Sequence, residues 1–142
     1  MKIYNAENQI LGRFSSIVAK ELLKGETIVV VNAEKAVVAG RPRYTLEKYA
    51  HKYERGDPLH GPFFPKQPDR ILRRTVRGML PWDRTKGRNA YRRLHVHIGV
   101  PDELKGNESS FMKVEAADAD KLNTKFVTVG EIAMHIGAKK RW

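Results

Sequence analysis

The sequence has no cysteine among its 142 residues, which excludes disulfide bonds and metal sites with thiolate ligands. It also has no uninterrupted apolar run long enough to cross a bilayer as a helix. Residues 1–5 lack the basic and apolar regions of a secretory signal peptide. These absences predict a soluble, cytoplasmic protein, and a chain without cysteine is compatible with a reducing compartment.

Features that support catalysis are also scarce. Neither serine pair, 15–16 or 109–110, is set in a nucleophile elbow, and Gly12 is too isolated to form a phosphate-binding loop. His95 and His97 share one side of an expected strand, but no other metal-ligating residue lies close to them in the sequence. We therefore expect that the protein is not an enzyme and that it binds no metal, no cofactor and no small-molecule substrate.

Positive charge is what the chain has in excess, and it is concentrated in the middle third. The net charge is +11. Residues 41–93 carry fifteen Lys and Arg against five Asp and Glu, whereas residues 1–40 carry five against four and residues 94–142 seven against seven. A surplus serving only solubility would be spread along the chain, so the distribution predicts a polyanionic partner. A membrane fits less well, because the basic segments lack apolar wedges at amphipathic spacing.

An amphipathic helix is predicted over residues 69–80, at the centre of this basic third. One face is apolar at helical spacing and consists of Ile71, Leu72, Thr75, Val76 and Met79. The opposite face carries Arg70, Arg73, Arg74 and Arg77, with only Asp69 as an acid. Because a solvated face normally mixes charges of both signs, we interpret this one as an RNA-binding surface. The planar fork of arginine suits phosphate and also stacks on bases.

The segments on either side of this helix are expected to extend the surface. Residues 82–93 are predicted to form a basic loop in which Trp82 and Tyr91 either stack on bases or belong to the core. Residues 56–65 are predicted to be an irregular, proline-stiffened excursion. The full set of expected RNA contacts is Arg41, Arg43, Lys66, Arg70, Arg73, Arg74, Arg77, Trp82, Arg84, Lys86, Arg88, Tyr91, Arg92 and Arg93.

The remainder of the chain predicts an α/β scaffold within one domain. Residues 2–5 are typical of a strand, residues 11–22 of an amphipathic helix and residues 27–31 of a strand buried on both faces. Such a βαβ unit has parallel strands. Another strand is expected at 36–39, but the short gap before it does not suit a parallel crossover, so its geometry stays open.

Further elements are expected towards the C-terminus. A helix is predicted from Thr45 to Tyr53, and residues 94–98 alternate like a strand. Residues 101–125 are polar, with a short helix expected near 114–119. A capping box predicts a C-terminal helix that ends in a basic tail, together spanning residues 128–142.

Several motifs together resemble those of a known family. They are Arg-Thr-Val-Arg-Gly-Met-Leu-Pro at 74–81, Lys-Gly-Arg at 86–88, Leu-His-Val-His-Ile-Gly at 94–99, Leu-Gly-Arg at 11–13 and Val-Val-Asn-Ala-Glu at 30–34. In this spacing the chain resembles the ribosomal protein L13 family of the large subunit. The resemblance covers residues 1–100 well and the rest loosely.

The resemblance implies a three-layer α/β/α domain with a four-stranded, mainly parallel sheet. It also implies a place in the large ribosomal subunit, in contact with its rRNA and with neighbouring ribosomal proteins. Residues 51–65 depart from the bacterial pattern, and the N-terminal extension of bacterial members is missing. The chain therefore resembles the archaeal form, or the core of a eukaryotic member.

We accordingly expect a structural protein that binds large-subunit rRNA and supports its folding and subunit assembly. Two other functions remain open on the sequence. An RNA-modifying enzyme such as a methyltransferase would suit an α/β domain with a basic face. So would a free regulatory RNA-binding protein.

Overall fold

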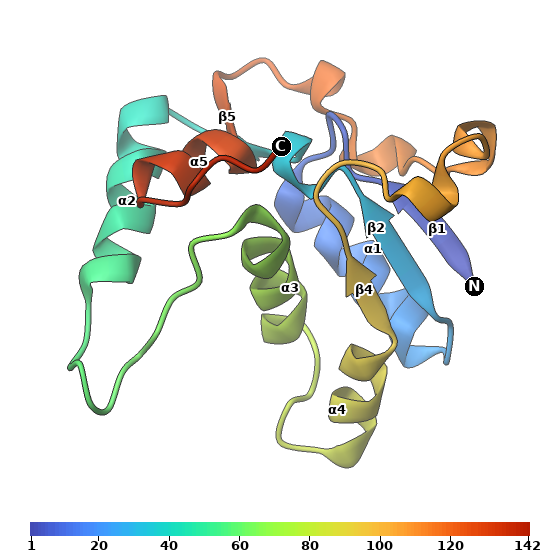
Figure 1. Ribbon diagram of the computed structural model, residues 1–142, viewed down its shortest axis with the longest axis horizontal. Coiled ribbons are helices and arrows are strands. Elements are labelled where there is room, and N and C mark those ends of the chain that lie inside the picture. The colour runs from blue at the N-terminus through green and yellow to red at the C-terminus, as the bar shows by residue number, and fades with distance from the viewer.

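A βαβ unit begins the fold in the computed structural model, which describes residues 1–142 (Figure 1). β1 (Lys2–Asn5) pairs in parallel with β2 (Ile28–Val31), and α1 (Leu11–Leu23) connects them. β4 (Leu94–Val96) pairs in parallel with the other edge of β2, which gives the order β1-β2-β4. All four residues of β2 are buried, as its β-branched sequence predicts for a central strand.

A second sheet contains two antiparallel strands, β3 (Val37–Ala39) and β5 (Phe126–Thr128). The 3-10 turn η1 (Ala33–Lys35) precedes β3 and redirects the chain out of the parallel sheet. The α/β class and the mainly parallel pairing are confirmed. The expected four strands in one sheet are wrong, because the short connection cannot hold a crossover and β3 pairs elsewhere.

The core lies between the parallel sheet and three helices, of which α1 follows β1 while the other two precede β4. α3 (Pro68–Gly78) and α4 (Thr85–Arg92) both pack against α1 and β4, and Figure 1 shows α1 behind the sheet. The largest side chains at the centre, which include Phe14, Leu22 and Leu94, are almost completely buried. This scaffold holds α3 and α4 side by side.

Two helices complete the domain, and one of them begins earlier than predicted. α2 (Pro42–Glu54) begins at a proline, whose fixed φ and missing N–H suit a first turn. Thr45, the expected cap, is instead buried inside the helix. α5 (Val129–His135) has the predicted capping box, in which Thr128 and Glu131 exchange hydrogen bonds of 3.2 and 2.9 Å.

The loop predicted over residues 82–93 is wrong, because residues 85–92 form α4. The sequence gives little sign of this helix, since only Gly87 and Ala90 are buried in it. The short helix expected near 114–119 is also wrong, since residues 102–121 contain four separate 3-10 turns. These are η2 (Asp102–Leu104), η3 (Glu108–Ser110), η4 (Glu115–Ala117) and η5 (Ala119–Lys121).

Residues 56–65 connect α2 to α3 without regular structure, as predicted, and we call them the arm. Two backbone hydrogen bonds between Asp57 and Gly61, of 2.9 and 3.1 Å, close a turn within it. Figure 1 shows the arm hanging below the body of the molecule, with α3 between it and α4. No helix is long and apolar enough to cross a membrane.

Candidate nucleic-acid interface

The two predicted faces of α3 are present. Ile71, Leu72 and Val76 are at most 1% exposed and belong to the main core. The end of the apolar face differs from the prediction: Met79 is 41% exposed and Leu80 is buried in its place. The reason is that α3 ends at Gly78, and a tighter turn then carries the chain inward.

The opposite face of α3 presents four arginines that have no acidic partner. No carboxylate oxygen lies within 4.0 Å of Arg70, Arg73, Arg74 or Arg77, whereas Arg43 pairs with Glu47 at 2.9 Å. Like charges one turn apart repel each other by a few tenths of a kcal/mol per pair. A polyanion laid against this face would convert the repulsion into attraction.

Two of these arginines stack on aromatic rings that follow α3 in the chain. The guanidinium carbon of Arg73 lies 4.9 Å from the centroid of the Tyr91 ring, and that of Arg77 lies 4.3 Å from the Trp82 ring. The two rings meet edge to face, with centroids 5.2 Å apart. We call these four residues the arginine–aromatic cluster. It joins α3 to α4 and fixes the position of two cations by cation–π attraction.

The rings of Trp82 and Tyr91 therefore have intramolecular neighbours on at least one side. Of the two functions considered for them, the contacts favour packing over base stacking. Trp82 nevertheless remains 37% exposed, and Arg88 donates from Nε to its carbonyl oxygen at 3.0 Å. Holding the guanidiniums in place before binding reduces the entropy lost when a ligand arrives.

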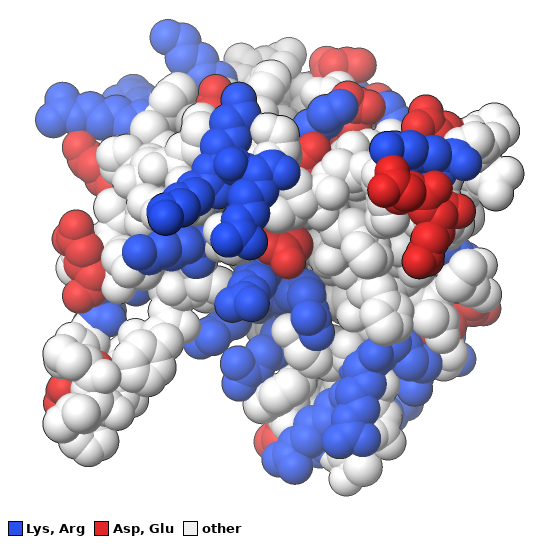
Figure 2. All heavy atoms as spheres, in the orientation of Figure 1, with Lys and Arg blue, Asp and Glu red and all other residues white.

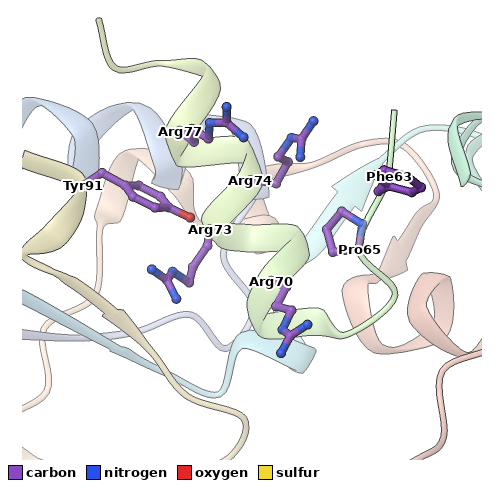
Figure 3. A pocket seen from close by; sticks show the side chains of 7 residues that line it. All are labelled: Phe63, Pro65, Arg70, Arg73, Arg74, Arg77 and Tyr91. Carbon is purple, nitrogen blue, oxygen red and sulfur yellow. The ribbon is translucent and has the colours of Figure 1, made fainter. Parts of the chain in front are cut away.

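A groove runs along the arginine face of α3, between the arm and α4, and we call it the arginine recess. It holds a hollow of about 350 Å³. Figure 3 shows Tyr91 on one side of α3 and the two arm residues on the other, with the arginines between them. The lining residues are Phe63, Pro65, Arg70, Arg73, Arg74, Arg77 and Tyr91.

A second hollow, of about 280 Å³, continues the groove towards the end of α3. It shares Arg74 and Arg77 with the first and adds Gly78, Leu80 and Trp82. Figure 2 shows basic side chains gathered in the recess and, to the right of the recess, over the lobe that contains α4. The arm, to the left of the recess, is almost free of charge. The cationic surface is thus bordered on one side by a largely apolar one.

The base of the arm is also crowded with cations and rings. The Lys52 ammonium lies 5.0 Å from the Tyr49 ring, and the Lys66 ammonium lies 4.8 Å from the Tyr53 ring. Burial, together with the charge of Lys48, lowers the pKa of Lys52. The charged form of Lys52 is therefore destabilised in the free protein. An anion bound beside it would offset this destabilisation.

The structure brings six of the predicted contact residues together along the recess, namely Arg70, Arg73, Arg74, Arg77, Trp82 and Tyr91. Arg84, Lys86, Arg88 and Arg92 are exposed on or beside α4. Arg93 is different, because its terminal nitrogen donates to the carbonyl oxygen of Leu22 at 2.7 Å and so binds the end of α1. Arg41 and Arg43 lie at the end of α2 farthest from the arm (Figure 1).

Two features of the basic surface were absent from the predicted set. Phe63 and Pro65 line the recess, and the only sequence signal for them was an aromatic pair between prolines inside the basic third. The tail residues Lys139, Lys140 and Arg141 add charge near the C-terminus, where Figure 2 shows a cluster of basic atoms. His95 and His97 are both exposed.

The fold and this surface together define an α/β protein with a row of four arginines that have no acidic partner, two of them held against aromatic rings. The chain belongs to the ribosomal protein L13 family, whose model matches residues 1–103. It is 52% identical over 137 residues to large ribosomal subunit protein uL13 of Archaeoglobus fulgidus, covering 95% of this chain and 86% of that protein.

Other archaeal proteins with the same name are similar over nearly their whole length. The protein from Methanosarcina barkeri is 48% identical over 143 residues, which cover 98% of this chain and 99% of the relative. The protein from Haloarcula marismortui is 43% identical over 141 residues, which cover 99% and 93%. These relatives agree with the archaeal resemblance found in the sequence.

Proposed function

We propose that this protein is a non-catalytic structural component of the large ribosomal subunit that binds its rRNA and supports the folding of that RNA during assembly. The observation that carries the proposal is the row of four α3 arginines without acidic partners, in a chain of the L13 family. As a ribosomal component the protein works in the cytoplasm, beside other large-subunit proteins.

The proposed mechanism divides the chain into a scaffold and a contact surface. The buried sheet and α1 fix α3, and the arginine–aromatic cluster fixes α4 against α3. Phosphates that approach the recess then meet two guanidiniums already in position, those of Arg73 and Arg77, beside the exposed Arg70 and Arg74. Each neutralised phosphate releases bound counterions, which makes binding favourable and strongly dependent on salt.

The two alternatives are less well supported. The family relationship favours the ribosomal role over an RNA-modifying enzyme. A free regulatory RNA-binding protein would share the arginine surface, so co-sedimentation with ribosomal subunits is the observation that separates the two.

The test is reconstitution on an identified RNA. Tagged protein is added to Archaeoglobus fulgidus large-subunit rRNA together with the other large-subunit proteins, and the particles are sedimented after a moderate salt wash. We expect the wild-type chain to remain with the large particles. A chain found only at the top of the gradient would contradict the proposal.

A pair of double variants assigns the contact surface in the same assay. Arg70→Gln with Arg74→Gln removes two exposed charges from the recess. Lys113→Gln with Lys125→Gln removes two exposed charges that make no ion pair, from the neutral C-terminal third. Loss of retention in the arginine variant alone is the expected result. Equal retention of both variants would exclude the recess as the contact.

A further inference from the structure

We infer that the arginine recess holds one unpaired nucleotide of the RNA, with its phosphate on the α3 arginines and its base against Phe63 of the arm. The inference rests on the proposed function and adds what the site recognises. It distinguishes a specific subsite for an extruded nucleotide from a general attraction to RNA phosphates.

The first step is the different chemistry of the two sides of the recess. On the α3 side, Arg70 and Arg74 are exposed and have neither an acidic nor an aromatic partner. On the arm side, Phe63 and Pro65 offer apolar surface, and the Phe63 side chain is 65% exposed. A ligand that fills both sides needs an anionic group and a flat apolar face a short distance apart.

The second step is that the arm holds Phe63 at the recess. The neighbouring Phe64 packs on the Tyr49 ring, with centroids 5.9 Å apart, and so anchors the arm to α2. At the turn, a Cβ on Gly56 would lie 2.7 Å from the backbone of Gly61. One phenylalanine of the pair is therefore partly buried as an anchor. The other, Phe63, remains exposed and lines the recess on the arm side of α3 (Figure 3).

The third step concerns the size and kind of ligand. A volume of about 350 Å³ is at the small end of the range for small-molecule sites. A paired duplex would offer phosphates only, because its bases are stacked inside. An unpaired nucleotide can be splayed out, so that its base stacks on an aromatic ring while its phosphate meets arginine. Of these two forms of RNA, only the unpaired nucleotide satisfies both sides of the recess.

An acidic protein segment with an aromatic residue is the competing occupant. Phosphate fits better because the guanidinium fork matches its oxygens in pairs. The surrounding residues 41–93 also carry fifteen basic against five acidic residues, a surplus suited to a continuous polyanion rather than to a short segment.

The test compares three arm variants on Archaeoglobus fulgidus large-subunit rRNA. Phe63→Ala removes the stacking ring, and Phe63→Tyr keeps it. Leu59→Ala is the matched control, because Leu59 is an 84% exposed apolar residue of the same arm that does not line the recess. Both side chains are at the surface, so circular dichroism and melting temperature should show that the three variants remain folded.

Four measurements support the inference if they agree. Phe63→Ala should weaken binding about tenfold, as expected for loss of one base–aromatic stack, while Phe63→Tyr and Leu59→Ala stay close to wild type. The slope of log affinity against log salt should be unchanged, because no charge is removed. Ultraviolet crosslinking with mass spectrometry should join one nucleotide to Phe63, and base-specific chemical probing should show that nucleotide exposed in the Phe63→Ala complex.

The contrary outcomes separate this inference from the proposed function. If wild-type protein binds the rRNA and Phe63→Ala binds equally well, the subsite is overturned and the ribosomal role stands. Equal affinity for a fully paired RNA with the same number of phosphates would also overturn the subsite. So would displacement by a glutamate-rich aromatic peptide that depends on Phe63. If wild-type protein fails to bind the rRNA at all, both proposals fall.

Discussion

The α3 arginines are one type of residue in two kinds of surroundings. The guanidinium carbons of Arg73 and Arg77 lie over the Tyr91 and Trp82 rings, whereas Arg70 and Arg74 project without an aromatic neighbour. A guanidinium stacked on a ring still has its N–H edge available for phosphate. Lysine at these positions would keep the positive charge of either arginine pair but would lack the planar guanidinium group.

This difference predicts unequal effects of a charge-preserving change. Arg73→Lys with Arg77→Lys should destabilise the protein by roughly 1 kcal/mol, since each exposed cation–π contact is worth about 0.5–1 kcal/mol. Arg70→Lys with Arg74→Lys should leave stability unchanged. Urea unfolding of both double variants measures this. Equal stability of the two would mean that the stacking does not hold α4 to α3.

Among the carboxyl groups of the scaffold, Glu21 has the most strongly lowered pKa. Hydrogen bonds from Lys2 and then Lys24 lower its pKa from 4.5 to about 2. The bond from Lys2 ties β1 to α1. A carboxyl whose pKa is lower in the folded state stabilises the fold above its unfolded pKa, and this contribution is lost as pH falls through the folded value.

The stabilisation from Glu21 should therefore be complete above about pH 4.5 and lost near pH 2. Glu21→Gln should be less stable than wild type at neutral pH and equal to it near pH 2. The difference is small because the lysine partners reach solvent, with 33% and 69% of their side chains exposed, and ion pairs in contact with solvent are screened. Denaturant melts across this pH range provide the test. A variant deficit that persisted undiminished at pH 2 would show that Glu21 acts through packing.

Among the secondary-structure elements, α3 was predictable and α4 was not. The faces of α3 follow from spacing, because its apolar residues contact a core that any amphipathic helix of that pattern would seek. α4 has no such stripe. It packs through Gly87, where an added Cβ would lie 2.0 Å from the carbonyl oxygen of Pro81. Because α4 packs through a glycine rather than through an apolar face, its sequence shows no hydrophobic periodicity.

The same contact predicts a test at the level of the element. Gly87→Ala should force α4 away from Pro81 and cost about 1–3 kcal/mol, as overpacking does. Gly78→Ala is the matched control, because nothing lies within 4 Å of its added Cβ. Since alanine favours helix over glycine, the control should be neutral or stabilising by up to about 1 kcal/mol. Thermal unfolding should rank the control above wild type and Gly87→Ala below. Equal melting temperatures would contradict the close contact.

The pairing of β3 with β5 was unpredictable for a different reason. Val37 aligns with Thr128 across some 90 intervening residues, and nothing local in either strand specifies such a partner. The short gap after β2 correctly argued against a parallel crossover but could not say where β3 goes. Long-range pairing is decided by how the whole core packs.

At the scale of the whole molecule, the residues that form the core and the residues that carry the positive charge come from different parts of the chain. Most of the main core comes from residues 1–36, α3, β4 and α5, whereas the net positive charge comes almost entirely from residues 41–93. α3 belongs to both, one face to each. That charge would sit on the middle third was predictable from counting. That the arm adds an apolar side to the recess was not, because a surface shared by two segments depends on the fold.

The double role of α3 leads to a prediction that separates binding from stability. Arg70→Gln with Arg74→Gln should weaken rRNA binding and lower the slope of log affinity against log salt by about one to two units. Its stability should hold or rise slightly, because crowded cations repel one another in the free protein.

Leu72→Ala is the converse change on the same helix. Leu72 is completely buried, so the truncation should cost about 2–5 kcal/mol of folding stability. At a temperature where all variants are folded, its affinity and salt slope should match wild type, because every charge is retained. Melting curves and filter binding between ~50 and ~200 mM salt measure both quantities.

An arginine variant that unfolds, beside a Leu72→Ala protein of normal stability, would show the two faces of α3 to be assigned in reverse. A flat salt response in wild type would remove the electrostatic basis of the proposed function.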